Sequence, residues 1–274
     1  MGKKIDLKGA DGMLIRILME NSALDGFTAE HGLSLYIEAN GRKILFDAGQ
    51  TDSFAENAAK LGVDLSQVDL CVLSHGHYDH SGGLMRFLEI NDHAPIYMHR
   101  RAAEPHYNGT EKYIGIAKEL IGHPRIIPTG DTLDLGCGMQ LRTCNALASG
   151  CPASARGMTV KCGEDFLQDS FDHEQYLVIE ENEKRIVISG CSHKGILDIV
   201  KWLEPDILIG GFHFAKLDPD GEDRAFMEDA ARQLLAHECV YYTGHCTGEA
   251  AFAFLKAHMG ERLQAIPAGT QIML

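Results

Sequence analysis

The sequence has 274 residues, of which 45% are hydrophobic and 23% charged, and its formal net charge is −14. A chain of this length and composition can bury a sizeable core, and we expect one domain over residues 1–274. The acidic balance argues against nucleic acid as the main partner, because phosphate backbones are bound through clustered Lys and Arg. A small anionic substrate is compatible with it.

No apolar run approaches the roughly 18 residues that a membrane span needs, and no apolar segment of the signal-peptide type follows the first residues. We therefore expect a cytoplasmic protein without a membrane partner; a homo-oligomer is possible. The eight cysteines include no C-x-x-C pair, and most should be buried thiols. A redox or metal role stays open for the dense central group, which consists of Cys137, Cys144, Cys151 and Cys162.

The first elements form an antiparallel β start. Short β-prone runs at 13–20 and 33–39 precede an Asn-Gly pair at 40–41, a strong hairpin signal, and a third run at 42–46. A helix at 51–61, a strand at 69–73, a helix at 83–88 and a short strand at 96–98 are predicted next.

The middle of the chain has a weaker pattern. After the strand at 96–98 we expect a polar helical segment up to residue 125, then short strands between turns at 126–141. Residues 148–172 show no period, and long irregular stretches of this kind are often functional, so we predict a substrate-covering insertion there. Three histidines of the helical segment are interpreted as surface or gating residues: His99, His106 and His123.

The second half alternates strands and helices, which predicts α/β layers. The strands are expected at 175–179, 185–189, 206–209 and 240–243, and the helices at 195–203, 222–237 and 248–258.

The most informative stretch, residues 71–84, reads CVLSHGHYDHSGGL. Three imidazoles and a carboxylate within six positions suit zinc, and also iron or manganese. In an extended backbone, side chains two apart point the same way, so His75 and His77 can converge on one ion. Asp79 and His80 are then left for a second ion.

This H-x-H-x-D-H string after an apolar strand resembles the signature of the metallo-β-lactamase superfamily. The resemblance implies an α/β fold, a four-layer αββα sandwich of two similar halves with mixed sheets and a one- or two-metal site at one edge. Asp47, in the strand-end sequence Phe-Asp-Ala-Gly, matches the first family motif. Its implied role is to support the metal-binding loop through hydrogen bonds.

The resemblance also implies ligands from the second half. His245 follows an apolar strand in a Gly-His pair like that of the last family motif, and His173 has the spacing of the remaining family histidine. Most members carry Gly-Asp where this chain has Gly190-Cys191. A thiolate replaces that carboxylate in a subclass of zinc β-lactamases, so Cys191 is a candidate ligand, with His193 as the alternative.

The resulting set divides into three roles. Two loop histidines lie outside the family motifs: His31 is either a surface residue or a substrate contact, and His213 suits an acid, a base or a phosphate contact. The predicted metal ligands are His75, His77, Asp79, His80, His173, Cys191 and His245; the predicted catalytic residues are Asp79, His193 and His213; Asp47 and His31 are assigned to support or substrate contact.

These residues predict a metal-dependent hydrolase in which two divalent ions, zinc before iron or manganese, activate water. The whole motif set is similar to the dihydropterin-related branch of the superfamily, which makes a ribofuranosyl-aminobenzene phosphate synthase the competing enzyme hypothesis. A non-catalytic metal or redox sensor is the third. We expect the substrate to be a small phosphorylated or phosphodiester metabolite.

Overall fold

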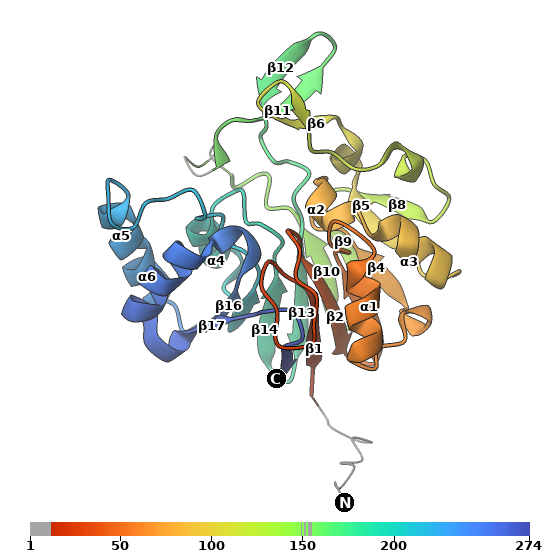
Figure 1. The fold of residues 1–274 in the computed structure, drawn as a ribbon, viewed down its shortest axis with the longest axis horizontal. Helices are drawn as coiled ribbons and strands as arrows, with labels where there is room; N and C mark the ends of the chain where they lie inside the picture. The colour runs from red at the N-terminus through yellow and green to blue at the C-terminus, as the bar shows by residue number, and fades with distance from the viewer. Residues whose placement is uncertain (1–11, 149, 151, 153–154) are drawn as a thin grey trace, which may run out of the picture.

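Two seven-stranded sheets form the centre of the protein in a computed structural model that describes residues 12–148, 150, 152 and 155–274 (Figure 1). In spatial order, the first sheet consists of β18 (Gln271–Met273), β1 (Leu14–Met19), β2 (Ser34–Ala39), β3 (Arg42–Phe46), β4 (Leu70–Val72), β5 (Ile96–His99) and β8 (Ile126–Thr129). The second consists of β17 (Leu263–Ala265), β16 (Val240–Thr243), β15 (Ile207–Ile209), β14 (Lys184–Ile188), β13 (Tyr176–Glu181), β10 (Met139–Arg142) and β9 (Thr132–Gly136).

Helices cover the outer face of each sheet, which gives the αββα order expected from the sequence (Figure 1). The α-helices are α1 (Ser53–Lys60), α2 (Tyr78–Ser81), α3 (Leu84–Ile90), α4 (Ile196–Leu203), α5 (Arg224–Leu235) and α6 (Glu249–Met259). Single turns of 3₁₀ helix lie at η1 (Leu65–Gln67), η2 (Arg100–Ala103), η3 (Lys118–Leu120), η5 (His245–Thr247) and η6 (Gly260–Arg262).

The layers follow from the two-residue period of the strands. In β3, Ile44 and Phe46 pack into the core between the sheets, whereas Leu45 between them packs under α1 and α3. In β14, Ile186 and Ile188 reach the same central core, and Val187 packs under the helices of the second half. Strands buried on both faces read as nearly continuous apolar runs, which is why they are visible in the sequence.

Parallel pairing brings the functional loops to one edge. Strands β3, β4 and β5 are parallel neighbours, as are β14, β15 and β16. The carboxyl ends of parallel strands lie at the same edge of a sheet, where open α/β sheets bind ligands. The loops after β3, β4, β14, β15 and β16 therefore meet, although they span most of the sequence.

A small third sheet corrects two predictions. It consists of β12 (Asp165–Gln168), β11 (Met158–Cys162), β6 (His106–Asn108) and β7 (Lys112–Tyr113), in that order, and extends beyond the sandwich (Figure 1). We call these four strands the β-flap. The expected helical segment before residue 125 was wrong, because strands and 3₁₀ turns occupy it, and the described part of 148–172 contains a hairpin. Strands that are polar and only partly buried, such as those of the β-flap, leave no clear two-residue period in the sequence.

Two of the histidines assigned to the surface are buried. His99 and His106 are each 1% exposed, whereas His123 is half-buried. Strands β17 and β18 were also missed: each has three residues of which one is buried, whereas β4 and β15, of the same length, are buried throughout. Among the central cysteines, Cys137 and Cys162 are exposed thiols and Cys144 is half-buried; Cys151 lies outside the described residues. None of the described helices is long and apolar enough to span a membrane.

Candidate metal centre

The loop after β4 and the start of α2 hold the sequence motif in a buried position. His75, His77, Asp79 and His80 are all at most 8% exposed. Burial removes water from the imidazoles, which disfavours their charged form, and the pKa of His75 and of His77 is held well below the usual range by this burial and by neighbouring histidines. Both rings are therefore neutral at pH 7, the form in which imidazole binds a metal.

The motif residues divide into two groups. Ring nitrogens of His75, His77 and His193 all lie within 4.8 Å of one another. In the second group, Asp79 Oδ2 lies 3.3 Å from His245 Nε2 and 3.8 Å from His80 Nε2. We call these groups the first and the second metal site.

Hydrogen bonds on the far side of four rings determine which nitrogen faces each site. A carboxylate or amide oxygen only accepts, so His80 Nδ1 donates to Asp47 (2.7 Å), His193 Nδ1 to Glu174 (2.8 Å) and His245 Nδ1 to Asn21 (2.8 Å). The hydroxyl of Ser74 donates to Asp47, so it accepts from His75 Nδ1 at 2.8 Å. In each neutral ring the lone pair is then on Nε2.

The Nε2 atoms of these rings converge. His80 Nε2 and His245 Nε2 are 3.2 Å apart, and the buried Nε2 atoms of His75 and His77 have no hydrogen-bond partner. Two lone pairs at this distance repel each other, and a proton or a metal ion between them removes the repulsion. Tetrahedral zinc with bonds of ~2.1 Å separates its ligand atoms by ~3.4 Å, so the residues fit a divalent ion.

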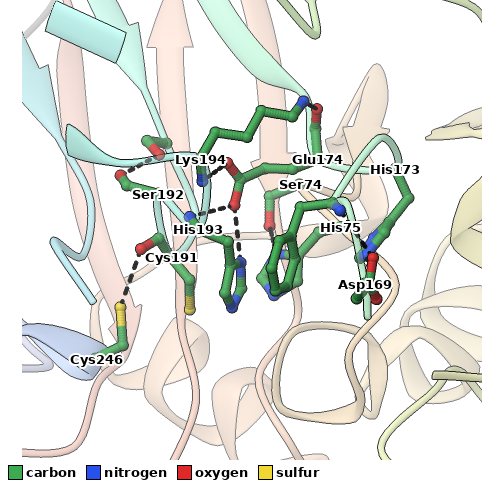
Figure 2. A network of polar contacts seen from close by, with 12 residues as sticks. Ser74, His75, Asp169, His173, Glu174, Cys191, Ser192, His193, Lys194 and Cys246 are labelled. Carbon is green, nitrogen blue, oxygen red and sulfur yellow. Dashed lines mark hydrogen bonds and ion pairs between the residues drawn. The ribbon is translucent and has the colours of Figure 1, made fainter. Parts of the chain in front are cut away.

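In the ring of His173 the two nitrogens have the opposite roles. Its Nδ1 accepts from the backbone N–H of Gly76 at 2.9 Å, so its proton is on Nε2, which faces Asp169 at 3.4 Å. A protonated Nε2 cannot bind a metal. The geometry thus brings His193, predicted as a catalytic residue with a ligand role as the alternative, next to His75 and His77, whereas Nε2 of the predicted ligand His173 faces Asp169 (Figure 2).

Asp47 makes the hydrogen bonds expected of its motif. It is fully buried and accepts from Ser74 N, Ser74 Oγ and His80 Nδ1, each at 2.7 Å. Burial alone would lower the pKa of His80, but the carboxylates of Asp47 and Asp79 raise it. Asp47 therefore fixes the position and ring orientation of the metal-binding loop.

The backbone around the site is strained. Asp47, Ser192, His213 and His245, four residues that follow strand ends, have positive φ values of 56°, 58°, 58° and 50°. This conformation is uncommon outside glycine and persists where the surrounding structure enforces it. Gly190 shows how closely the halves approach, since a Cβ there would lie 2.3 Å from Ser74 Oγ.

Cys191 lies between the two sites. Its Sγ is 3.2 Å from His80 Nε2 and belongs to one cluster with His75 and to another with His245 and Cys246. Burial raises the pKa of the thiol well above its usual range, and a bound cation would reverse this effect. Cys246, which the sequence reading overlooked, donates from Sγ to Cys191 O at 3.4 Å (Figure 2).

Replacing Cys191 with serine should remove a thiolate from the metal environment. We expect the Co²⁺-loaded parent to show thiolate-to-cobalt charge-transfer absorption, the Cys191→Ser protein to lose it, and the Cys246→Ser control to retain it, because the Cys246 thiol is engaged by a backbone carbonyl. Near-ultraviolet absorption of the three proteins measures this. A band that is unaffected by Cys191→Ser, or is lost in Cys246→Ser, would exclude Cys191 as ligand.

A cavity of about 230 Å³ opens onto both sites. His31 and His213 line it, and His31 Nε2 lies 3.2 Å from Asp79 Oδ2. His213 Nδ1 is buried without a partner, and burial followed by His193 lowers the pKa of His213 to about 3. His213 is therefore a neutral hydrogen-bonding group, which makes the predicted phosphate contact uncharged. The apolar part of the lining includes Ile114 and Met158.

Several residues of the site were not found from the sequence. Glu174, buried beside His193, lies next to the predicted His173, and only its contact reveals its role. His106 Nδ1 lies 2.7 Å from Asp169 Oδ2, and with His77 and His173 they form another cluster of metal-ligand atoms. Contacts over more than sixty residues create this cluster, so no local spacing signals it.

Comparisons with known proteins agree with this architecture. A model of the metallo-beta-lactamase superfamily matches residues 27–139. An uncharacterised protein of Methanocaldococcus jannaschii is 28% identical over 266 residues, 90% of this chain and 98% of the relative. The 7,8-dihydropterin-6-methyl-4-(beta-D-ribofuranosyl)-aminobenzene-5'-phosphate synthase of the same organism is 30% identical over 272 residues, 89% of this chain and 90% of the relative.

Among solved structures, Tm1679, described as a metal-dependent hydrolase of the beta-lactamase superfamily, superposes with a TM-score of 0.80 at 28% identity, over 96% of this chain and 99% of that one. Together with the αββα fold and the histidine and aspartate clusters at its edge, these matches show that the chain belongs to the metallo-β-lactamase superfamily.

Proposed function

We propose that the protein is a hydrolase with a dinuclear metal centre that acts on a small phosphorylated or phosphodiester metabolite. The observation that supports it most is the convergence of buried Nε2 atoms at two adjacent sites, because a divalent ion at each site would satisfy several of these nitrogens at once. Zinc suits the nitrogen, oxygen and sulfur donor set, and iron and manganese are the alternatives.

When bound, two divalent ions polarise a phosphoryl oxygen and lower the pKa of a water molecule toward neutrality. The protein supplies orientation. Asp79, 12% exposed in its side chain, lines the cavity and would accept a hydrogen bond from such a water. His213 lines the cavity, where its neutral ring would contact the phosphoryl oxygen.

The charge of the cavity supports an anionic substrate. The described residues that line it include two lysines, Lys112 and Lys216, and one carboxylate, Asp79. The charges of these three side chains sum to a positive value before any metal is added, although the net charge of the chain is −14. The small cavity suits a compact ligand better than a polymer.

The competing enzyme function is a synthase like the Methanocaldococcus jannaschii relative, with a ribosyl phosphate substrate. Identity of 30% over 90% of that protein favours it. Product analysis distinguishes the two, because a hydrolase incorporates water into its products whereas a synthase joins two substrates. A metal or redox sensor would turn over no substrate at all.

The test is a panel of phosphodiester, phosphomonoester, thioester, lactone and β-lactam substrates with zinc-loaded parent, His213→Ala and the control His93→Ala, an exposed histidine. We expect turnover of phosphoesters, a kcat/KM about tenfold to a hundredfold lower in His213→Ala, and parental activity in His93→Ala. Turnover of lactam or lactone alone, or a His213→Ala protein as active as the parent, would contradict the proposal.

A further inference from the structure

Two lysines of the cavity enter the function proposed above only through their charge, and neither has a specific partner there. Lys112 belongs to β7 in the β-flap, and its Nζ lies 5.5 Å from the centre of the Tyr78 ring, which stands between His77 and Asp79 in the metal-binding loop. Lys216 lies on the loop after β15, three residues beyond His213. The two ammonium groups thus approach the cavity from different parts of the chain.

Neither lysine is neutralised within the protein. Among the described residues, no ion pair or hydrogen bond involves Lys112 Nζ or Lys216 Nζ. Both side chains are exposed. In a protein with 39 acidic and 25 basic residues, two lysines without carboxylate partners at one cavity constitute a local excess of positive charge.

The base of the β-flap is fixed to the metal-binding loop. His106, in β6, contacts Asp169, just after β12, at 2.7 Å. Asp169 also contacts His173 at 3.4 Å, and His173 accepts from Gly76 N, inside the metal-binding loop. All of these side chains are buried. These buried contacts connect β6 to the metal-binding loop, and β7, which pairs with β6, is thereby placed beside the metal sites.

The surface between the lysines suits the body of a small molecule. Asn108, which pairs with Lys112 across β6 and β7, also lines the cavity, and Ile114 and Met158 add apolar side chains to this lining. A ligand seated here would have one end at the metals and the other near the lysines.

We propose that Lys112 and Lys216 together bind a phosphate monoester group of the substrate, remote from the bond that reacts at the metals. The assignment rests on the proposed function, since it places the reacting bond at the metal sites. Two ammonium groups match the charge of −1.5 to −2 that a phosphate monoester has near neutral pH. A carboxylate, with a charge of −1, would neutralise only one of the two ammonium groups.

Isothermal titration of the zinc-loaded, full-length protein tests this proposal with three compact probes: glycerol 3-phosphate, glycerate and glycerol. The variants are Lys112→Gln, Lys216→Gln and the control Lys161→Gln. Lys161 lies in β11 of the same flap with its Nζ 5.5 Å from the Phe166 ring, outside the cavity. Metal content is measured for each protein, so that a change in binding is not due to lost metal.

We expect the parent and the control to bind glycerol 3-phosphate more tightly than glycerate or glycerol. Each cavity variant should weaken binding of glycerol 3-phosphate by about threefold to tenfold, with glycerol unaffected. Added salt should reduce the difference, because the lysines are exposed. Equal affinity for glycerate and glycerol 3-phosphate, or equal binding by the variants and the control, would overturn the proposal.

The outcome is separable from that of the hydrolase proposal. Loss of glycerol 3-phosphate binding in both lysine variants, in a protein that hydrolyses no phosphoester, would support the lysine site and refute the hydrolase function. Phosphoester turnover by the parent, with unchanged binding in the variants, would refute the lysine site alone.

Discussion

The His193→Ala protein should lose metal from the first site and at least about a hundredfold in kcat/KM, more than the tenfold to hundredfold typical of residues that only support a ligand. The reason is that His193 presents a lone pair on Nε2 toward His75 and His77. Element analysis of dialysed protein, together with steady-state kinetics, measures both effects.

His173→Asn is the matched comparison. An asparagine oxygen can still accept from Gly76 N–H, which His173 Nδ1 does in the parent, so we expect two metal equivalents and a modest loss of activity. If His173→Asn loses one metal equivalent and His193→Ala retains both, the assignment of these two histidines must be exchanged.

Asp47→Ala should have the largest effect on stability. The substitution leaves Ser74 N–H and His80 Nδ1–H buried without their acceptor, and removal of one partner from a buried charged network costs about 3–5 kcal/mol. It should also weaken metal binding by about tenfold to a hundredfold, since His80 loses its orientation.

Urea unfolding of the metal-free protein and competition with a chelating dye separate these two effects. Asp64→Ala is the control. This exposed aspartate is the N-cap residue of η1, outside the metal sites, and it accepts a hydrogen bond from the backbone N–H of Ser66. We expect unchanged metal affinity in the control. A metal-free Asp47→Ala protein that is as stable as the parent would refute the supporting role of Asp47.

The layered fold was predictable because burial on both faces leaves a strong signal. Strands such as β3 and β14 alternate between two apolar environments and so read as apolar runs in the sequence. The β-flap left no such signal, since the residues of β11 and β12 are half-buried or exposed and β11 pairs with β6 across about fifty residues. The β propensity of the residues does not reveal pairing between strands that are far apart in the sequence.

The site was predictable to the extent that it is local. The spacing from His75 to His80 put both halves of the metal centre on one loop, and strand ends directed attention to Cys191, His213 and His245. The choice between His173 and His193 depends on which ring nitrogen has the proton, and this is determined by contacts with Gly76 and Glu174. These contacts connect segments up to about a hundred residues apart, so they are visible only in three dimensions.

We expect two cations at adjacent sites, one bound by His75, His77 and His193 and the other by Asp79, His80 and His245. Anomalous diffraction from crystals of the zinc-loaded protein, recorded on both sides of the zinc absorption edge, tests this expectation directly. We expect two anomalous peaks, one within each group of ligand atoms, with Cys191 Sγ beside them. A peak between His106, Asp169 and His173, with none beside His193, would contradict it.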